Sequence, residues 1–304
     1  MFHKGKKLRR KDVYNALSHC PICLSEEKRT CIAVIQNEPK IEMLLCDECK
    51  GISASLMPQK KIIERYYKDY YKNNDLGVTF HNTDRFAKHI LERIRINPQN
   101  DKISILDFGG GNGDLAKDMA RRLIDENSKL AINITLVDYD PRIDDDNLPT
   151  NIKFEIKREI REVYKKYDIV LASAVLEHIP KLNDVIKKLF TLIAENGFFY
   201  TRTPHMVPFK KIFKGLDLTY PAHVHDLGAS FWNRFGQTFG LKTKVIISQP
   251  AIVETELKKA FVPTLSASIL KFPAYLELGL SKKRKDLLWD YYGGWEVILK
   301  KIGK

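Results

Sequence analysis

The sequence predicts an α/β fold in which a mostly parallel sheet carries helices on both faces, preceded by a small N-terminal module. Three observations lead to this prediction. Short apolar runs alternate with segments of helical spacing, a glycine-rich turn connects one such run to the helix after it, and two cysteine pairs lie near the N-terminus. Alternation of this kind is typical of parallel strands joined by crossover helices.

The most informative segment is the turn Asp107-Phe-Gly-Gly-Gly-Asn-Gly113. It follows the apolar run 102–106, which predicts a buried strand, and it leads into 114–124, which has the spacing of a helix. A strand, a glycine turn and a helix in this order place a ligand at the carboxyl end of a parallel sheet.

The residue types in this turn indicate the kind of ligand. Gly109, Gly111 and Gly113 lack side chains, so the backbone can turn sharply and a ligand can lie against it. The spacing differs from the Gly-x-Gly-x-x-Gly pattern that binds a pyrophosphate at a helix N-terminus. Because the carboxylate of Asp107 would repel phosphate, the turn favours a cationic or hydroxyl-rich ligand.

Length and charge set broad limits. The 304 residues allow one large α/β domain and a small module. The net charge of +13 favours an anionic partner such as nucleic acid, a nucleotide-linked substrate or a membrane surface, although scattered lysines also fit a solvated surface. No apolar run approaches the ~18–20 residues of a membrane span, and no secretory signal is expected. We therefore expect a cytoplasmic protein with reduced cysteines.

The cysteine pairs predict a metal site. In Cys20-Pro-Ile-Cys23 and Cys46-Asp-Glu-Cys49, two residues separate the cysteines of each pair. Two such turns together form a tetrahedral all-sulfur site, for which zinc is the expected ion. Four cysteine ligands leave no open coordination position, so the role would be structural. We assign residues 1–55 to a zinc ribbon with a basic N-terminal arm.

Two strands, at 30–35 and 41–45, are expected between the cysteine pairs. His19 could replace a cysteine as ligand, but four cysteines already suffice. Cys31 is left over and is expected to be a small core residue. Residues 56–82 then form a connecting helix with two pairs of tyrosines, four residues apart, on one face. These tyrosines fit either a packing stripe or a lid that presents phenols to a substrate.

The main domain is predicted at 83–304, and its second strand, 131–137, ends in Asp138-Tyr-Asp140. Asp138 directly follows the strand and is placed to accept hydrogen bonds from both hydroxyls of a ribose. Tyr139 could stack beside the attached base, and Asp140 is the alternative acid. Further strands are predicted at 152–156, 167–173, 198–203, 241–247 and 293–300.

Two segments contribute candidate proton acceptors. Glu177 and His178 follow the strand 167–173, and they fit either a structural pair at a helix end or a base near the reacting atom. His223 and His225 lie two residues apart and share one face of an extended backbone. They are candidates for substrate contact or base catalysis, whereas metal binding by this pair alone is not expected.

An insertion is predicted at 250–292, and it is rich in Leu, Phe, Pro and Lys. Its part 260–285 is apolar enough to cap a pocket or to make peripheral contact with a membrane, and Lys282-Lys-Arg-Lys285 fits an anionic surface. A helical cover packed on the sheet is the alternative.

Six features follow one another along the chain: the ribbon, the tyrosines, the glycine turn, the acid after the second strand, Leu176-Glu-His-Ile179 and Gly294-Trp-Glu-Val297. With these features in this order, the chain resembles the class I S-adenosylmethionine-dependent methyltransferases. The resemblance extends to members that modify nucleotide-linked sugars or surface-polysaccharide intermediates. It implies a Rossmann-like sheet of seven strands with an antiparallel last strand. The chain departs from many of these relatives at Asp226-Leu-Gly228, where they have an aromatic pair.

The resemblance also implies roles for individual residues. S-adenosylmethionine would lie with its methionine end at the glycine turn, and the acceptor would be a small molecule or a carbohydrate. The residues that would contact the cofactor are Asp107, Gly109, Gly111, Gly113, Asp138, Tyr139, Ala172 and Ser173, and the candidate catalytic residues are His178, His223 and His225.

Two other functions remain open at this point. Some rRNA base methyltransferases also combine a cysteine-rich ribbon with this fold, and the positive charge suits a nucleic acid. The sequence has no Asn-Pro-Pro-Tyr motif after the fourth strand, which disfavours this alternative. The other alternative is a protein that binds the cofactor or a carbohydrate without catalysis.

Overall fold

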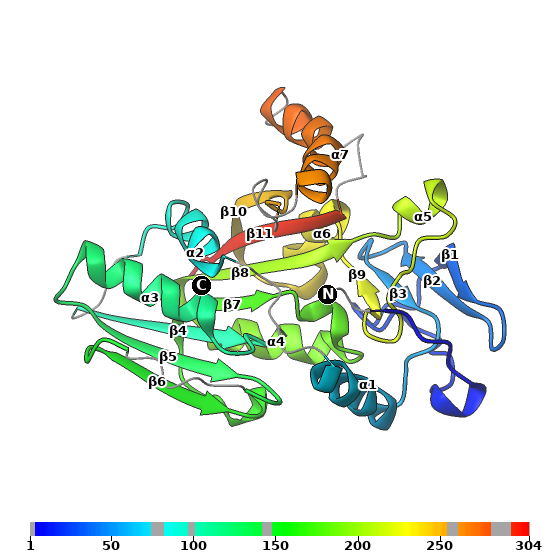
Figure 1. Ribbon diagram of the computed structural model, residues 1–304, viewed down its shortest axis with the longest axis horizontal. Helices are drawn as coiled ribbons and strands as arrows, with labels where there is room; N and C mark the ends of the chain where they lie inside the picture. Colours follow the sequence, from blue (N-terminus) through cyan, green and yellow to red (C-terminus); the bar gives the residue numbers. More distant parts are fainter. Residues whose placement is uncertain are drawn as a thin grey trace.

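The computed structural model describes residues 4–73, 82–96, 101–141, 148–253, 261–280 and 293–303. The strands in these ranges form two sheets, one of seven strands and one of four. Figure 1 shows the larger sheet flanked by helices, with the smaller sheet beside the carboxyl ends of its parallel strands.

The seven-stranded sheet confirms the predicted fold class. Its order is β10-β11-β8-β7-β4-β5-β6. The strands from β8 to β6 in this order run parallel, and β11 is antiparallel to both β8 and β10. The strands are β4 (Lys102–Phe108), β5 (Ala131–Val137), β6 (Ile152–Lys157), β7 (Tyr167–Ser173), β8 (Ile193–His205), β10 (Thr243–Pro250) and β11 (Gly293–Lys301).

Helices cover both faces of this sheet. In the central strand β7, Val170 packs with α4 and α6, whereas its neighbour Ile169 packs with α2 and α3. Successive side chains of a strand point to opposite faces, so burial on both sides explains why β7 is apolar along most of its length. These helices are α2 (Thr83–Leu91), α3 (Asp114–Glu126), α4 (Leu182–Leu192) and α6 (Ala229–Phe239).

The four-stranded sheet joins the ribbon to the main domain. Its order is β1-β2-β3-β9, and β9 is the two-residue strand His225–Asp226. Ile52 pairs with Asp226, and Ser53 pairs with His225. The predicted division at residues 55 and 82 stays a prediction. The ribbon strands are β1 (Arg29–Gln36), β2 (Ile41–Cys46) and β3 (Ile52–Ala54).

Cys31 does not have the expected place in the core, because it is exposed on β1. β1 is an edge strand of the small sheet, and only Ala33 and Gln36 of this strand are buried. The prediction was therefore wrong at this residue, where solvent rather than protein covers the side chain.

The connecting helix α1 (Lys60–Asn73) includes the predicted tyrosine pairs. Tyr66 is buried, and its hydroxyl donates to the carbonyl of Lys4 at 3.1 Å. The ring of Tyr67 lies edge-on to that of His178, with 5.9 Å between centroids. The side chains of Tyr70 and Tyr71 lie outside the described residues.

The remaining elements are short, apart from α7. α7 lies inside the predicted insertion 250–292, of which 254–260 and 281–292 lie outside the described residues. In the described part of the chain, no helix is long and apolar enough to cross a membrane. These elements are α5 (Phe209–Ile212), α7 (Phe261–Leu280) and the 3-10 turns η1 (Arg10–Asp12), η2 (Ile160–Glu162) and η3 (Leu176–His178).

The buried carboxylate of Asp226 fixes the point where ribbon and main domain meet. One oxygen accepts from Nδ1 of His205 at 2.6 Å. The other accepts from the backbone N–H groups of Met206 and Val207 at 2.6 and 2.8 Å. Three donors would lose their acceptor if this side chain were removed.

Asp226→Ala is therefore expected to lower the free energy of unfolding by about 2–4 kcal/mol, because buried donors without an acceptor each cost about 1–3 kcal/mol. Urea unfolding followed by circular dichroism measures this change. As a control, Asp125→Ala on the exposed surface of α3 should change the value by less than about 0.5 kcal/mol. Equal effects of the two substitutions would contradict the anchoring role.

Candidate functional site

The glycine turn has the backbone that its sequence predicts. Gly109, Gly111 and Gly113 have φ angles of 72°, 61° and 74°, a region that favours glycine. A Cβ at Gly109 would come within 2.3 Å of the Val175 side chain, and one at Gly113 within 2.9 Å of the Phe154 ring. A Cβ at Gly111 would meet nothing within 4 Å. The outer two glycines thus allow close packing, and the middle one borders open space.

Asp107 lies beneath this turn with a buried carboxyl group. It is 2% exposed, and its Oδ2 has no hydrogen-bond partner among the described residues. Burial, followed by the nearby carboxyl groups of Asp138 and Asp114, raises its pKa to about 7. A cationic group placed here would give the carboxylate the partner that it lacks.

Asp138 bridges the tip of β5 and the glycine turn. Its Oδ2 accepts from the backbone N–H of Gly111 at 2.8 Å, and its Oδ1 accepts from that of Asp140 at 3.1 Å. Each carboxylate oxygen has a second lone pair, so the side chain can still accept from hydroxyl groups. Burial raises the pKa of Asp138. Tyr139 beside it is 72% exposed, and Asp140 is exposed as well.

The two predicted residues at the end of β7 differ in their surroundings. Ala172 is fully buried in the core, and its carbonyl accepts from Oγ1 of Thr201 at 2.8 Å. Ser173 is half-buried, and its Oγ has no hydrogen-bond partner among the described residues. Neighbouring side chains point to opposite faces of a strand, so Ala172 and Ser173 lie on opposite faces of the sheet. The Oγ atom of Ser173 is buried on its face.

His178 lies in η3 directly after β7. Its Nδ1 donates to the carbonyl of Ala222 at 2.9 Å, so Nε2 is the acceptor of the neutral ring. Burial lowers its pKa to about 4, which keeps the ring neutral at pH 7. Nε2 lies 3.7 Å from Oε1 of Glu177, and the ring of His223 lies 4.7 Å away between centroids.

Glu177, His178 and His223 form one cluster, in which the ligand-type atoms all lie within 4.8 Å of one another. Such a group can share a proton or hold a cation. The sequence did not indicate that Tyr67 contacts His178 or that Glu177 and His223 would meet, since these residues come from separate parts of the chain.

His225 lies two residues after His223, at the start of β9. It is 1% exposed within β9, and its Nε2 donates to the carbonyl of Ile179 at 2.9 Å. Burial lowers its pKa to about 4. A small pocket between the ribbon and the end of β8 is lined by Met43, Met206, His223, His225 and Asp226, among others.

Sequence reasoning also missed a buried polar group on the sheet. Glu296 of β11 is fully buried, and its Oε1 accepts from Nε2 of His89 at 2.8 Å and from Nε2 of Gln249 at 2.6 Å. An acid within the otherwise apolar run 293–300 was the available signal.

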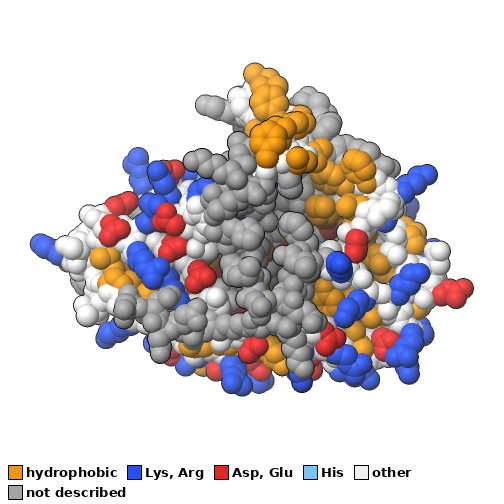
Figure 2. Space-filling view, in the orientation of Figure 1, with side chains coloured by type: hydrophobic (Ala, Val, Ile, Leu, Met, Phe, Trp, Pro, Cys, Tyr) orange, Lys and Arg blue, Asp and Glu red, His pale blue; other side chains and the backbone are white. Residues whose placement is uncertain are grey.

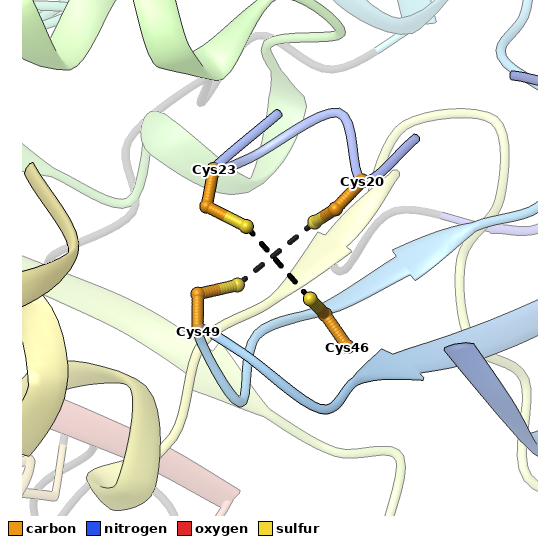
Figure 3. A group of neighbouring side chains, drawn as sticks. All are labelled: Cys20, Cys23, Cys46 and Cys49. Carbon is orange, nitrogen blue, oxygen red and sulfur yellow. Dashed lines mark hydrogen bonds between the residues drawn. The ribbon is translucent and has the colours of Figure 1, made fainter. Parts of the chain in front are cut away.

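The four predicted metal ligands converge from two turns (Figure 3). Sγ of Cys20 lies 3.9 Å from that of Cys49, and Sγ of Cys23 lies 3.8 Å from that of Cys46. Metal–sulfur bonds of ~2.3 Å in a tetrahedron give sulfur–sulfur edges of about 3.8 Å, so the spacing fits a bound zinc ion.

The two cysteine turns have the same backbone design. In each, the N–H of the residue after the second cysteine donates to the carbonyl of the first: Leu24 to Cys20 at 2.9 Å and Lys50 to Cys46 at 3.0 Å. Leu24 and Lys50 both have positive φ angles, of 66° and 57°. This turn brings both sulfurs of a pair to one side.

A sequence model of the family described as "Methyltransferase domain" matches residues 79–242, more than half of the chain. The chain belongs to this methyltransferase family. The match includes the glycine turn, Asp138 and the end of β7, so these lie in an S-adenosylmethionine-dependent methyltransferase domain.

Several solved structures are similar to the chain. Coclaurine N-methyltransferase, bound to N-methylheliamine and S-adenosylhomocysteine, is 14% identical, with a TM-score of 0.43 over 72% of this chain and 70% of that one. The plantazolicin methyltransferase BamL is 11% identical, with a TM-score of 0.46 over 79% and 91%. The [4+2]-cyclase SpnF is 14% identical, with a TM-score of 0.44 over 72% and 81%. A search of curated protein sequences finds no match.

The buried Asp107 gives a pH-dependent stability. Its folded-state pKa of about 7 exceeds its ordinary 3.8, so between these values the folded protein holds a proton that the unfolded chain has released. Without cofactor, the protein should lose stability as the pH rises from about 4 to 7, by up to about 1.4 kcal/mol per pH unit.

The matched variant Asp107→Asn lacks this titration. Urea unfolding of both proteins from pH 5 to 8 should show the variant gaining stability relative to the parent as the pH rises. A difference between the two proteins that does not depend on pH would show that Asp107 ionises normally.

Proposed function

We propose that the protein transfers a methyl group from S-adenosylmethionine to a small or carbohydrate acceptor, such as a nucleotide-linked sugar or a surface-polysaccharide intermediate. The observation that carries the cofactor assignment is the buried, unsatisfied oxygen of Asp107 beneath the open space at Gly111. A cationic ligand with a ribose fits this place, because Asp138 offers hydroxyl acceptors at its other end.

In this proposal, Asp107 and the three glycines hold the methionine end of the cofactor, Asp138 holds the ribose, and Tyr139 covers the adenine. Ser173, with Ala172 behind it, lies at the reacting end. The bound cofactor supplies a methyl group on a positively charged sulfur. Because that group is already activated, the protein contributes mainly the alignment of the acceptor atom with the carbon–sulfur bond.

The acceptor side would use His178, His223 and His225. His178 is neutral at pH 7 and has Nε2 as an acceptor, so it can take a proton from an acceptor hydroxyl or carbon acid. Oε1 of Glu177, 3.7 Å from Nε2, would stabilise the resulting imidazolium. His223 shares this cluster, and His225 would act through Nδ1, which has no hydrogen-bond partner among the described residues.

We further propose that Cys20, Cys23, Cys46 and Cys49 hold a structural zinc ion. Four thiolates surround the space between the turns, and no ligand position would be left open for catalysis. Thiolate ligands persist in a reducing compartment, which supports a cytoplasmic location.

Calorimetry with S-adenosylhomocysteine tests the cofactor site. Asp138→Ala removes the hydroxyl acceptor, and Gly111→Val puts a side chain into the open space at a strained φ of 61°. Each should weaken binding by at least about tenfold, equivalent to 1.4 kcal/mol.

Asp140→Ala is the matched control, because this neighbouring acid is exposed, and it should bind nearly as tightly as the parent. Unchanged binding in both Asp138→Ala and Gly111→Val would refute the site. Tight binding without turnover on any sugar nucleotide or polysaccharide intermediate would favour a non-catalytic binding protein.

Metal analysis tests the ribbon. The purified protein should contain about one zinc ion per chain. The double variant Cys20→Ser/Cys49→Ser should lose it, and it should also lose stability because metal binding contributes to folding. Cys31→Ser is the control, since Cys31 is exposed and lies outside the cluster. A folded parent protein without metal would contradict the assignment.

A further inference from the structure

The helix α7 contacts the rest of the protein mainly through small and polar residues. Its buried positions are Thr264, Lys271 and Ala274, which are small or polar. Nζ of Lys271 donates to the carbonyl of Ala251, and the hydroxyl of Tyr275 donates to that of Pro250. An ordinary surface helix buries its large apolar side chains, whereas the buried residues of α7 are small or polar, and Leu278 is only partly buried against the core.

The large apolar side chains of α7 face outward. Figure 1 shows this helix projecting from the body, and Figure 2 shows apolar side chains gathered on it. Within 261–280, none of the exposed positions carries a charge. The exposed fractions are 61% for Phe261, 69% for Val262, 43% for Leu265, 62% for Ile269, 63% for Phe272, 51% for Leu276 and 80% for Leu280. A patch of this kind marks an interaction surface.

The exposed apolar side chains form one continuous stripe along α7. At about 100° per residue, the seven positions fall within an arc of about 100°. A helix that lies in a membrane surface immerses such a stripe in the lipid and has basic residues beside it at the headgroups. The charged residues next to α7 therefore decide between lipid and another protein chain.

The charge around the helix indicates which lipid. In the sequence, Lys282-Lys-Arg-Lys285 follows α7, whereas Lys258 and Lys259 before the helix are balanced by Glu254 and Glu256. The chain as a whole has a net charge of +13. Basic residues beside an apolar helix attract it to anionic headgroups.

The position of α7 relates this surface to the site. β10 and β8 are both antiparallel to β11, so β10 ends at the same edge of the sheet as the parallel strands. α7 is held at that edge through Pro250 and Ala251. The glycine turn and the histidine cluster lie at the same edge, after β4 and β7.

We infer that α7 docks on an anionic membrane surface and that the acceptor is presented there, as a saccharide or small group attached to a lipid. The docking stands on the exposed apolar face and the flanking charges. Only the identity of the acceptor rests on the proposed methyl transfer.

Vesicle flotation of the full-length protein tests this inference. The protein should float with vesicles that contain phosphatidylcholine and about 30% phosphatidylglycerol, and it should not float with phosphatidylcholine alone. Ile269→Gln/Phe272→Gln should lower the partition coefficient at least tenfold. Replacing Lys282, Lys283, Arg284 and Lys285 with Gln should weaken binding mainly at low salt.

Ile156→Gln/Val34→Gln is the matched control, because it also removes two exposed apolar side chains, one on β6 and one on β1. It should bind vesicles like the parent. Calorimetry with S-adenosylhomocysteine, without lipid, checks that each variant is folded, and it reports on the methyltransferase proposal independently.

Three outcomes would overturn the inference. One is a parent protein that floats with neither vesicle type. Another is flotation that persists in Ile269→Gln/Phe272→Gln, which would leave only a general charge attraction. The third is a dimer in sedimentation velocity that this double substitution dissociates, which would make the apolar face an interface between two copies of the chain.

Discussion

Hydrogen bonds on both sides of Val224 set the geometry of the proposed acceptor region. The N–H of Val224 donates to the carbonyl of Glu177 at 2.9 Å, and its carbonyl accepts from the N–H of Ala54 at 2.8 Å. One residue of the main domain thus bridges η3 and the ribbon. The side chains of His178 and His225 bond to backbone carbonyls on either side of this bridge. This bridge at Val224 therefore helps to hold the proposed proton acceptors His178 and His225 close together.

The cofactor side rests on a different constraint, the burial of Asp107. A carboxyl group with an unsatisfied oxygen lowers the stability of the free protein whenever it ionises. A bound cation would reverse that effect, because opposite charge favours the ionised form. Such an arrangement is typical of binding sites, where groups that are unfavourable in the free protein become favourable with ligand. In the free protein, the hydrogen bond from the N–H of Gly111 to Asp138 fixes the glycine turn.

The elements that local pattern specifies were predictable from the sequence. The strands, the glycine turn and the cysteine turns follow from apolar periodicity, glycine and cysteine spacing, which act over a few residues. The contribution of β9 was not predictable, because a two-residue strand has no periodicity and pairs with residues far away in the chain. The exposure of the apolar face of α7 was not predictable either, because a helical pattern does not show which neighbouring element covers that face.

The ribbon and the main domain share one core. Cys20, Cys46 and Cys49 pack in the same apolar cluster as α4 and α6, and Nδ2 of Asn183 donates to the carbonyl of Ile22 between two of the cysteines at 2.9 Å. Metal binding adds its free energy to whatever structure forms the site. Here that structure includes β3, which pairs with β9 and with its residue His225. The ribbon therefore lies beside the proposed acceptor region, and the proposed zinc ion would stabilise that region without touching the reacting atoms.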